Sequence, residues 1–123
     1  MKEYRLGRME TRFADIIWAK EPLSTRELVS ACEKELGWKR TTTYTVLKKL
    51  CERGLFRIDN STVTSLVPRE SVRKAESRDF VELHFGGSLP AFLNAFTDGR
   101  RLTEEEAASL RKMIEEYEEG GRA

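Results

Sequence analysis

Residues 40–54 have two chemically distinct faces when they are placed on a helix. One face is apolar and consists of Thr43, Val46, Leu47, Leu50 and Cys51. The other face has hydroxyl and amino groups but no carboxylate, and its members are Thr41, Thr42, Tyr44, Thr45, Lys48 and Lys49. A solvated helix face usually mixes both charge signs, whereas a helix that lies against nucleic acid needs cations and short hydrogen-bonding side chains. The pattern therefore predicts a DNA-reading helix, with a merely solvated face as the alternative.

Two helices are predicted before this segment, and a tight connection joins the second of them to the DNA-reading helix. The first should cover Gly7 to Ala19 and end before Glu21-Pro22, since proline disfavours helical geometry in the residue that precedes it. Ser24-Thr25-Arg26-Glu27 is a capping box, which opens a second helix that stops at Gly37. Only about three or four residues then precede the DNA-reading helix, which matches a helix-turn-helix. The residues expected to face inward are Met9, Phe13, Ile16 and Ile17 from the first helix and Leu28, Ala31, Cys32 and Leu36 from the second.

A β-hairpin is predicted directly after the DNA-reading helix. Gly54 can end that helix in the left-handed conformation. Residues 55–58 and 62–67 are rich in β-branched and aromatic side chains, and Asp59-Asn60-Ser61 between them is a turn signal. An isolated hairpin is marginally stable in water, so this one must pack on the helices. A hairpin in this position is the wing of a winged-helix domain.

The remainder of the chain is predicted to be helical and to hold more apolar residues than it can bury alone. Helices are expected from Val72 to Phe85, after Ser88-Leu89-Pro90, and after a capping box at Thr103. Burial against the same segment of a second chain would cover the surplus. Folding back onto the N-terminal part is the alternative. The residues assigned to dimerisation are Phe80, Leu83, Phe92, Phe96, Leu110, Ile114 and Tyr117.

The expected fold is mainly α with a small β-hairpin. It comprises a winged helix-turn-helix DNA-binding domain in residues 1–69 and a helical dimerisation domain in residues 70–123. Residues 1–69 hold 14 Lys and Arg against 9 Asp and Glu, while residues 70–123 hold 8 against 12. A balance of +5 beside one of −4 indicates that the first part meets a polyanion, unless the asymmetry arises by chance.

Several classes of protein are disfavoured by composition. The two cysteines, Cys32 and Cys51, and the single histidine, His84, are too scattered for a zinc or copper site, so no metal or cofactor is expected. Core packing of both cysteines is favoured over a disulfide or redox switch. An enzyme is disfavoured because the chain has a single histidine, no phosphate loop and no clustered carboxylates in an apolar pocket setting. No apolar run approaches the length of a membrane span and no hydrophobic signal core begins the chain, so a cytoplasmic location without membrane insertion is expected.

The order of these elements resembles the penicillinase repressor family, the BlaI/MecI-type repressors to which the copper-responsive CopY-type repressors are related. The resemblance covers nearly the whole chain. It rests on the order and spacing of short motifs, none diagnostic alone: Met9 and Ile16-Ile17-Trp18, Ser24 to Leu28, Trp38, Thr42, Leu47, Leu50 and Gly54, Val72 to Phe96, and Leu102-Thr103-Glu104.

The resemblance implies a homodimer that binds a palindromic double-stranded DNA operator and is released by proteolysis or by weakening of the dimer. In the β-lactam-resistance systems of this family, a membrane-anchored sensor metalloprotease triggers cleavage in the dimerisation helices. By position the scissile bond would be Ala95–Phe96, although the best-known members have Asn before the Phe. The copper-responsive branch ends in a cysteine-rich tail that is absent here. The wing tip, Asp59-Asn60-Ser61, also lacks the basic residues and glycine usual in the family.

The predicted DNA contacts follow from the chemistry of the side chains. Threonine hydroxyls can reach base edges or phosphates, and their methyl groups can contact thymine. Cationic side chains neutralise phosphates. The predicted DNA-binding residues are Lys39, Arg40, Thr41, Thr42, Tyr44, Thr45, Lys48, Lys49 and Arg57. The alternatives are a metal-responsive repressor of the same family and a winged-helix module that binds protein.

Overall fold

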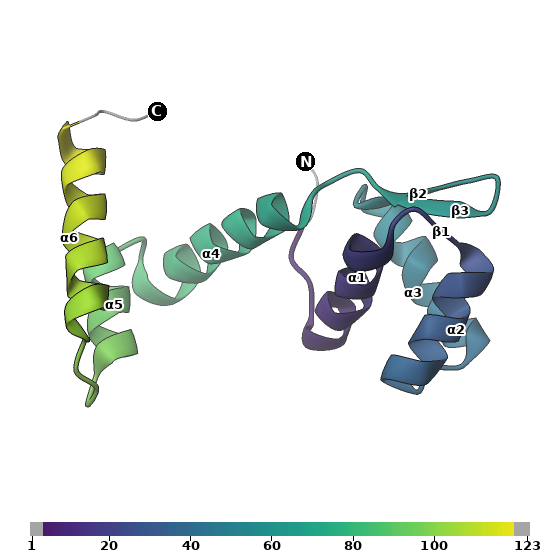
Figure 1. Ribbon diagram of the computed structural model, residues 1–123, viewed down its shortest axis with the longest axis horizontal. Coiled ribbons are helices and arrows are strands. Elements are labelled where there is room, and N and C mark those ends of the chain that lie inside the picture. Colours follow the sequence, from purple (N-terminus) through teal and green to yellow (C-terminus); the bar gives the residue numbers. More distant parts are fainter. Residues whose placement is uncertain (1–3, 120–123) are drawn as a thin grey trace. The chain divides into compact units, whose positions relative to one another are not determined.

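The computed structural model describes residues 4–119 (Figure 1). It divides into two compact units. Unit 1 ends at Phe80 and unit 2 begins at Val81, so the boundary falls within a helix. The secondary structure confirms the predicted fold class, with six helices and a small antiparallel sheet in the described part of the chain. The predicted functional boundary after residue 69 stays a prediction.

Unit 1 contains three complete helices and the first turns of a fourth. The helices are α1 (Arg8–Lys20), α2 (Thr25–Leu36), α3 (Arg40–Glu52) and α4 (Arg69–Phe85). The predicted capping box of α2 is confirmed, because the Ser24 hydroxyl accepts from the Glu27 N–H at 3.0 Å and the Glu27 carboxylate accepts from the Ser24 N–H at 2.8 Å. Gly37 ends α2 with a φ of 69°, which only glycine adopts without strain.

The sheet has one strand more than the predicted hairpin. Its strands are β1 (Leu23–Ser24), β2 (Phe56–Asp59) and β3 (Thr62–Ser65), in the order β1-β3-β2. Asn60 and Ser61 form the turn with positive φ values of 52° and 60°, as in the tight turns that suit hairpins. Strand β1 was not predicted because two residues carry no alternation that could mark a strand. It joins the start of α2 to the hairpin.

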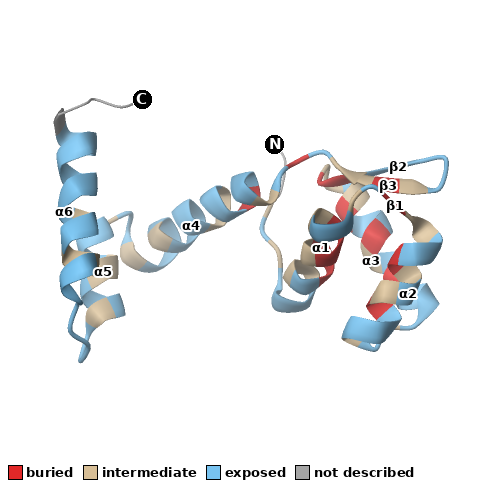
Figure 2. Ribbon diagram, viewed as in Figure 1, coloured by how far each residue is buried: buried red, intermediate tan, exposed pale blue. Residues whose placement is uncertain are grey.

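The core of unit 1 lies between the three helices and the sheet. The buried positions lie on the helices and strands of this unit (Figure 2). The largest fully buried side chains include Phe13, Leu28, Leu47, Leu50 and Phe56. One prediction for the core is wrong: Met9 is 40% exposed, and Ala14 is buried on α1 instead. Met9 lies in the first turn of α1, before the two turns that hold all four of the buried residues of this helix.

Unit 2 consists of the end of α4 with α5 (Leu89–Thr97) and α6 (Glu104–Glu119). The predicted breaks at Gly86-Gly87 and Asp98-Gly99 are confirmed, and so is the capping box of α6. There Thr103 and Glu106 exchange hydrogen bonds of 3.0 Å. None of the described residues of unit 2 is buried (Figure 2). This unit by itself therefore has no closed core.

The observed ends of several elements differ from those predicted. Helix α1 and strand β2 each begin and end one residue later than predicted. Helix α4 begins at Arg69, three residues before the predicted start at Val72. Strand β3 ends at Ser65, two residues before the predicted end of the hairpin. The pairing nevertheless continues past the strand, because the Leu66 N–H donates to the Leu55 carbonyl at 2.8 Å.

Candidate nucleic-acid interface

Helix α3 is fixed in rotation by its apolar face. Thr43, Leu47 and Leu50 are buried, and Val46 and Cys51 are partly buried, as predicted. The opposite face is exposed, and its exposed members are Thr41, Thr42, Tyr44, Thr45, Lys48 and Lys49. Tyr44 is 37% exposed, so its hydroxyphenyl group is not part of the core. The structure therefore brings the hydroxyls and cations of the predicted DNA-reading face together on one surface of unit 1.

The hydroxyl groups of α3 differ in what they can still offer. The Thr45 hydroxyl donates to the Thr41 carbonyl at 2.9 Å, which leaves its oxygen as an acceptor. Within the part of the chain that the structure describes, the Thr41 and Thr42 hydroxyls make no hydrogen bond. These two side chains are accordingly free to donate as well as to accept. Amino groups and carbonyl oxygens on base edges require both kinds of partner.

Three cations of α3 and its N-cap make no ion pair within the described part of the chain. They are Lys39, at the N-cap, Arg40 and Lys48. The Arg40 guanidinium carbon lies 5.7 Å from the centre of the Tyr44 ring, a cation–π contact that orders both side chains. Arg40 and Tyr44 therefore form a preorganised pair on the exposed face.

Lys49 is placed differently from the other cations of α3. Its Nζ lies 2.9 Å from Glu10 Oε2 of α1, and Arg53 Nη1 lies 3.4 Å from Glu10 Oε1. The Gly7 N–H also donates to this carboxylate at 3.1 Å. Burial opposes ionisation of Glu10, but these hydrogen bonds and the two positive charges outweigh it, so its pKa is lower than the ordinary 4.5. Lys49 thus holds α3 against α1 as well as facing solvent.

Glu10 is a contact of the candidate site that the sequence did not reveal. It is 39 positions away from Lys49, and no local pattern connects a carboxylate on one helix with a cation on another. Its side chain is only 19% exposed, whereas that of Lys49 is 60% exposed. The predicted face has no carboxylate among residues 41–49 of α3, but the exposed Glu52 lies one turn after Lys48 on the same helix. A carboxylate from α1 also reaches the edge of the face.

Arg57 is the one predicted DNA contact outside the segment 39–49. It lies on β2, is 60% exposed, and pairs with Asp59 at 3.4 Å. Ile58, its neighbour, is 45% exposed and borders a hollow of about 410 Å³ between α3 and β2. Tyr44 and Lys48 line the same hollow, which shows that the hairpin lies beside the DNA-reading face. The predicted wing position is thus supported, while the charge of Arg57 is partly neutralised.

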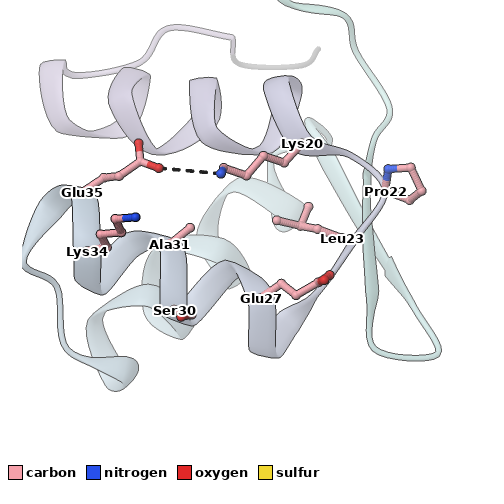
Figure 3. Close-up of a pocket in the computed structure, with 8 residues that line it drawn as sticks. All are labelled: Lys20, Pro22, Leu23, Glu27, Ser30, Ala31, Lys34 and Glu35. Atoms are coloured by element: carbon pink, nitrogen blue, oxygen red, sulfur yellow. Dashed lines mark ion pairs between the residues drawn. The ribbon is translucent and has the colours of Figure 1, made fainter.

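A second hollow lies between α1 and α2, away from the predicted DNA contacts (Figure 3). It has a volume of about 400 Å³ and contains side chains of both charge signs. Lys20 Nζ and Glu35 Oε2 face each other in it at 3.9 Å. None of the predicted site residues lines this hollow, and its mixed polarity does not define a ligand.

Both cysteines are free, and neither is activated. Burial raises the pKa of the Cys32 thiol to about 11, and it also raises the pKa of Cys51. Thiols with raised pKa are protonated at neutral pH and react slowly. Among residues 4–119, no group of His, Cys, Asp and Glu side chains is arranged to hold a metal ion. No helix in that range is long and apolar enough to cross a membrane.

Comparison with known proteins gives matches that cover nearly the whole chain. The penicillinase repressor family matches residues 6–116. The methicillin resistance regulatory protein MecI of Staphylococcus aureus strain Mu50 is 23% identical over 117 residues, which cover 92% of this chain and 95% of that protein. The MecI proteins of Mammaliicoccus sciuri and Staphylococcus epidermidis are each 22% identical over the same shares. The matches include both units, so they are not limited to the helix-turn-helix.

The Glu10 cluster yields a prediction for stability. Because the pKa of Glu10 is lowered on folding, its contribution is present above the ordinary value of 4.5 and is lost as the pH falls below it. We expect Glu10→Gln to reduce the free energy of unfolding by about 1 kcal/mol near neutral pH, the typical net contribution of one intramolecular hydrogen bond. The difference should shrink at low pH, as the Glu10 carboxylate becomes protonated in the folded protein. Urea unfolding at both pH values measures it.

The matched control for this prediction is Glu33→Gln, an exposed carboxylate on α2. It should change the free energy of unfolding little at either pH. A loss for Glu10→Gln that is equally large at low pH would contradict an electrostatic role for this carboxylate.

Proposed function

Because the chain belongs to the penicillinase repressor family, we propose that it represses transcription as a homodimer bound to a palindromic operator in double-stranded DNA. The regulated genes would belong to a β-lactam-resistance system or a related one. The protein would act in the cytoplasm. The observation that carries the proposal is the exposed face of α3. It combines free threonine hydroxyls with cations that no described carboxylate neutralises.

The reading geometry follows from this face. With α3 in the major groove, Thr41, Thr42 and Thr45 would address base edges, and Lys39, Arg40 and Lys48 would contact phosphates. Lys49 and Arg57 would add charge at the edges of the contact, reduced by Glu10 and Asp59. Each neutralised phosphate releases about one counterion, so affinity should fall steeply with salt.

A dimer would supply the affinity that one reading helix lacks. A single helix contacts only a few base pairs, whereas two helices about 34 Å apart read two half-sites one DNA turn apart. Unit 2 offers the apolar surface for this pairing, since Leu83 is 69% exposed, Ile114 61% and Phe96 60%. A second copy of unit 2 would cover these side chains and complete a core that one chain does not close.

The reading face generates the first functional prediction. We expect Thr42→Ala/Lys48→Ala to lower operator affinity by at least about tenfold, because one base-edge hydroxyl and one phosphate contact are lost. The slope of log affinity against log salt should fall by about one unit. Mobility-shift titrations at several salt concentrations provide both values, with an operator selected from a random duplex library.

The control is Ser30→Ala/Lys34→Ala, which removes the same groups from α2 away from the reading face. It should retain most of the affinity. Equal losses in both double variants would mean that α3 does not read the operator. Binding that ignores salt and duplex would favour the alternative of a protein-binding winged helix.

The exposed apolar side chains of unit 2 generate a prediction for assembly. We expect Leu83→Glu/Ile114→Glu to raise the dimer dissociation constant by at least about 100-fold, because each buried leucine or isoleucine contributes roughly 1.5–3 kcal/mol. Sedimentation equilibrium measures the change. The control Leu66→Glu alters a leucine of unit 1 that is 51% exposed and should leave the dimer unchanged. A monomeric wild-type chain at micromolar concentration would exclude the dimer itself.

Release by proteolysis would act through the dependence of operator affinity on dimerisation. Ala95 and Phe96 are exposed near the end of α5, and the bond between them lies three residues before the Asp98 cap. A protease needs extended backbone, so the last turn of α5 would have to unwind before cleavage. A cut there would separate α6 from the rest of the chain. The sensor metalloprotease of the family would be the partner that initiates this cut.

The consequence of cleavage can be tested with a chain that ends at Ala95. We expect it to be monomeric and to bind the operator at least about 100-fold more weakly, because the two half-sites are no longer linked. A chain that ends at Glu119 is the control and should behave as the full chain. Full dimerisation and affinity in the chain that ends at Ala95 would contradict release at this bond.

A further inference from the structure

One face of the first turns of α4 contacts the winged-helix part of unit 1. Its members are Arg69, Val72, Glu76 and Asp79, which recur at helical spacing over eleven residues. Eleven helical residues span about 16 Å, three turns of the helix. Each member of this face touches a residue that precedes it by more than 40 positions or enters the core, so the contacts are not internal to the helix.

Arg69 attaches the start of α4 to α1. Its Nε lies 3.0 Å from Asp15 Oδ1, and its guanidinium carbon lies 5.7 Å from the centre of the Trp18 ring. The Nε makes no hydrogen bond, so its contact with the Asp15 carboxylate is a charge pair. Arg69 Nη2 also donates a hydrogen bond to the Asp15 carbonyl at 3.5 Å. Trp18 is held in turn, because its indole N–H donates to the Val67 carbonyl at 3.0 Å. The Arg69 guanidinium therefore packs against an indole ring that is itself held in place by a hydrogen bond.

The next two turns are attached by one apolar contact and one hydrogen bond. Val72 is 2% exposed and belongs to the core of unit 1. One turn further, Glu76 Oε2 accepts a hydrogen bond from the Leu6 N–H at 3.0 Å. Asp79 lies 3.9 Å from Arg5, a weaker contact between exposed groups. The attachment thus extends from the first residue of α4 to its third turn.

We propose that Asp15, Arg69, Val72 and Glu76 act as a latch that sets which half-site spacing the dimer accepts. None of these side chains lies on the reading face of α3, so they are positioning residues. The inference rests on the proposed function, because it assumes that α4 connects a DNA-reading unit with a dimerising one. It adds a determinant of operator choice that is separate from base recognition.

The physical reason is the difference between a short and a long connection. While the latch is closed, residues 69–79 are held on unit 1, so only the chain that follows them can act as a tether between the reading helix and the dimerising unit. With the latch open, residues 66–80 would act as a loose tether. A tether lowers the effective concentration of the second reading helix but lets it reach half-sites at several spacings. Loss of the latch should therefore lower affinity and selectivity for spacing together.

The test compares two double variants of the full chain with equal changes in charge. Arg69→Met/Glu76→Ala removes the charge pair and the acceptor for the Leu6 N–H. Arg73→Met/Glu70→Ala removes one arginine and one glutamate from exposed positions of the same helix. Sedimentation equilibrium and thermal unfolding establish that both variants are folded dimers. Hydrogen exchange of the amides of residues 70–80 reports whether the latch has opened.

The readout is the affinity of each variant for a set of duplexes. In these duplexes, two selected half-sites are moved apart or together by one or two base pairs. For the wild type and the control variant, we expect a two-base-pair change to weaken binding at least about tenfold, because base pairs also rotate the half-sites around the helix. For the latch variant, this ratio should fall to about threefold or less. Affinity for the original spacing should fall as well.

Three outcomes have distinct meanings. An unchanged spacing ratio in a latch variant whose residues 70–80 exchange faster would overturn the inference. A wild type that binds as a monomer, or shows no spacing preference, would instead contradict the proposed dimeric function. If the double variant does not fold, the single variant Glu76→Ala is compared with Glu76→Gln, which keeps an acceptor for the Leu6 N–H. Equal spacing ratios in that pair would overturn the inference too.

Discussion

Burial of one side of α3 is the constraint on which the candidate interface depends. Thr43, Leu47 and Leu50 lie in the core beneath the helix, and this fixes its rotation. The residues on the opposite side are then exposed, and no further interaction is needed to expose them. The free hydroxyls and cations are consequences of packing, because a rotation of the helix would expose the leucines and bury the lysines. The high cost of burying an unpaired charge makes the observed rotation the stable one.

The sequence was sufficient wherever the signal is local. The two faces of α3, the capping box at Ser24 and the turn at Asn60-Ser61 follow from residues within one or two turns of each other, and all three are confirmed. Features that join distant parts of the chain were not predicted. Strand β1 exists only because Leu23 pairs with Val63 of β3. A segment of two residues has no sequence pattern from which a strand partner 40 positions away could be predicted.

The electrostatics of the candidate site show the same limit. A count of charges along residues 40–54 gives the composition of the face, but it does not show which charges are compensated. Glu10 is supplied by α1 and engages both Lys49 and Arg53, which leaves Lys48 as the cation of the central turns without a described partner. The local field of the reading face is therefore weaker at its C-terminal end than the sequence indicates. Two adjacent lysines of α3 differ in role because only one reaches a neighbouring helix.

The two units solve the problem of burial in different ways. Unit 1 closes a core of fourteen buried apolar residues, which includes Val72 of α4. Unit 2 has a similar supply of phenylalanine and leucine but no buried residue among those described. Its helices are capped and folded locally, as the bonds at Ser88 and Thr103 show. Local capping can define three short helices, but burial of apolar surface is the main source of stability. A chain with this division would gain most of its missing burial from the proposed association of two copies of unit 2. Control of that association would then also control the proposed DNA binding by unit 1.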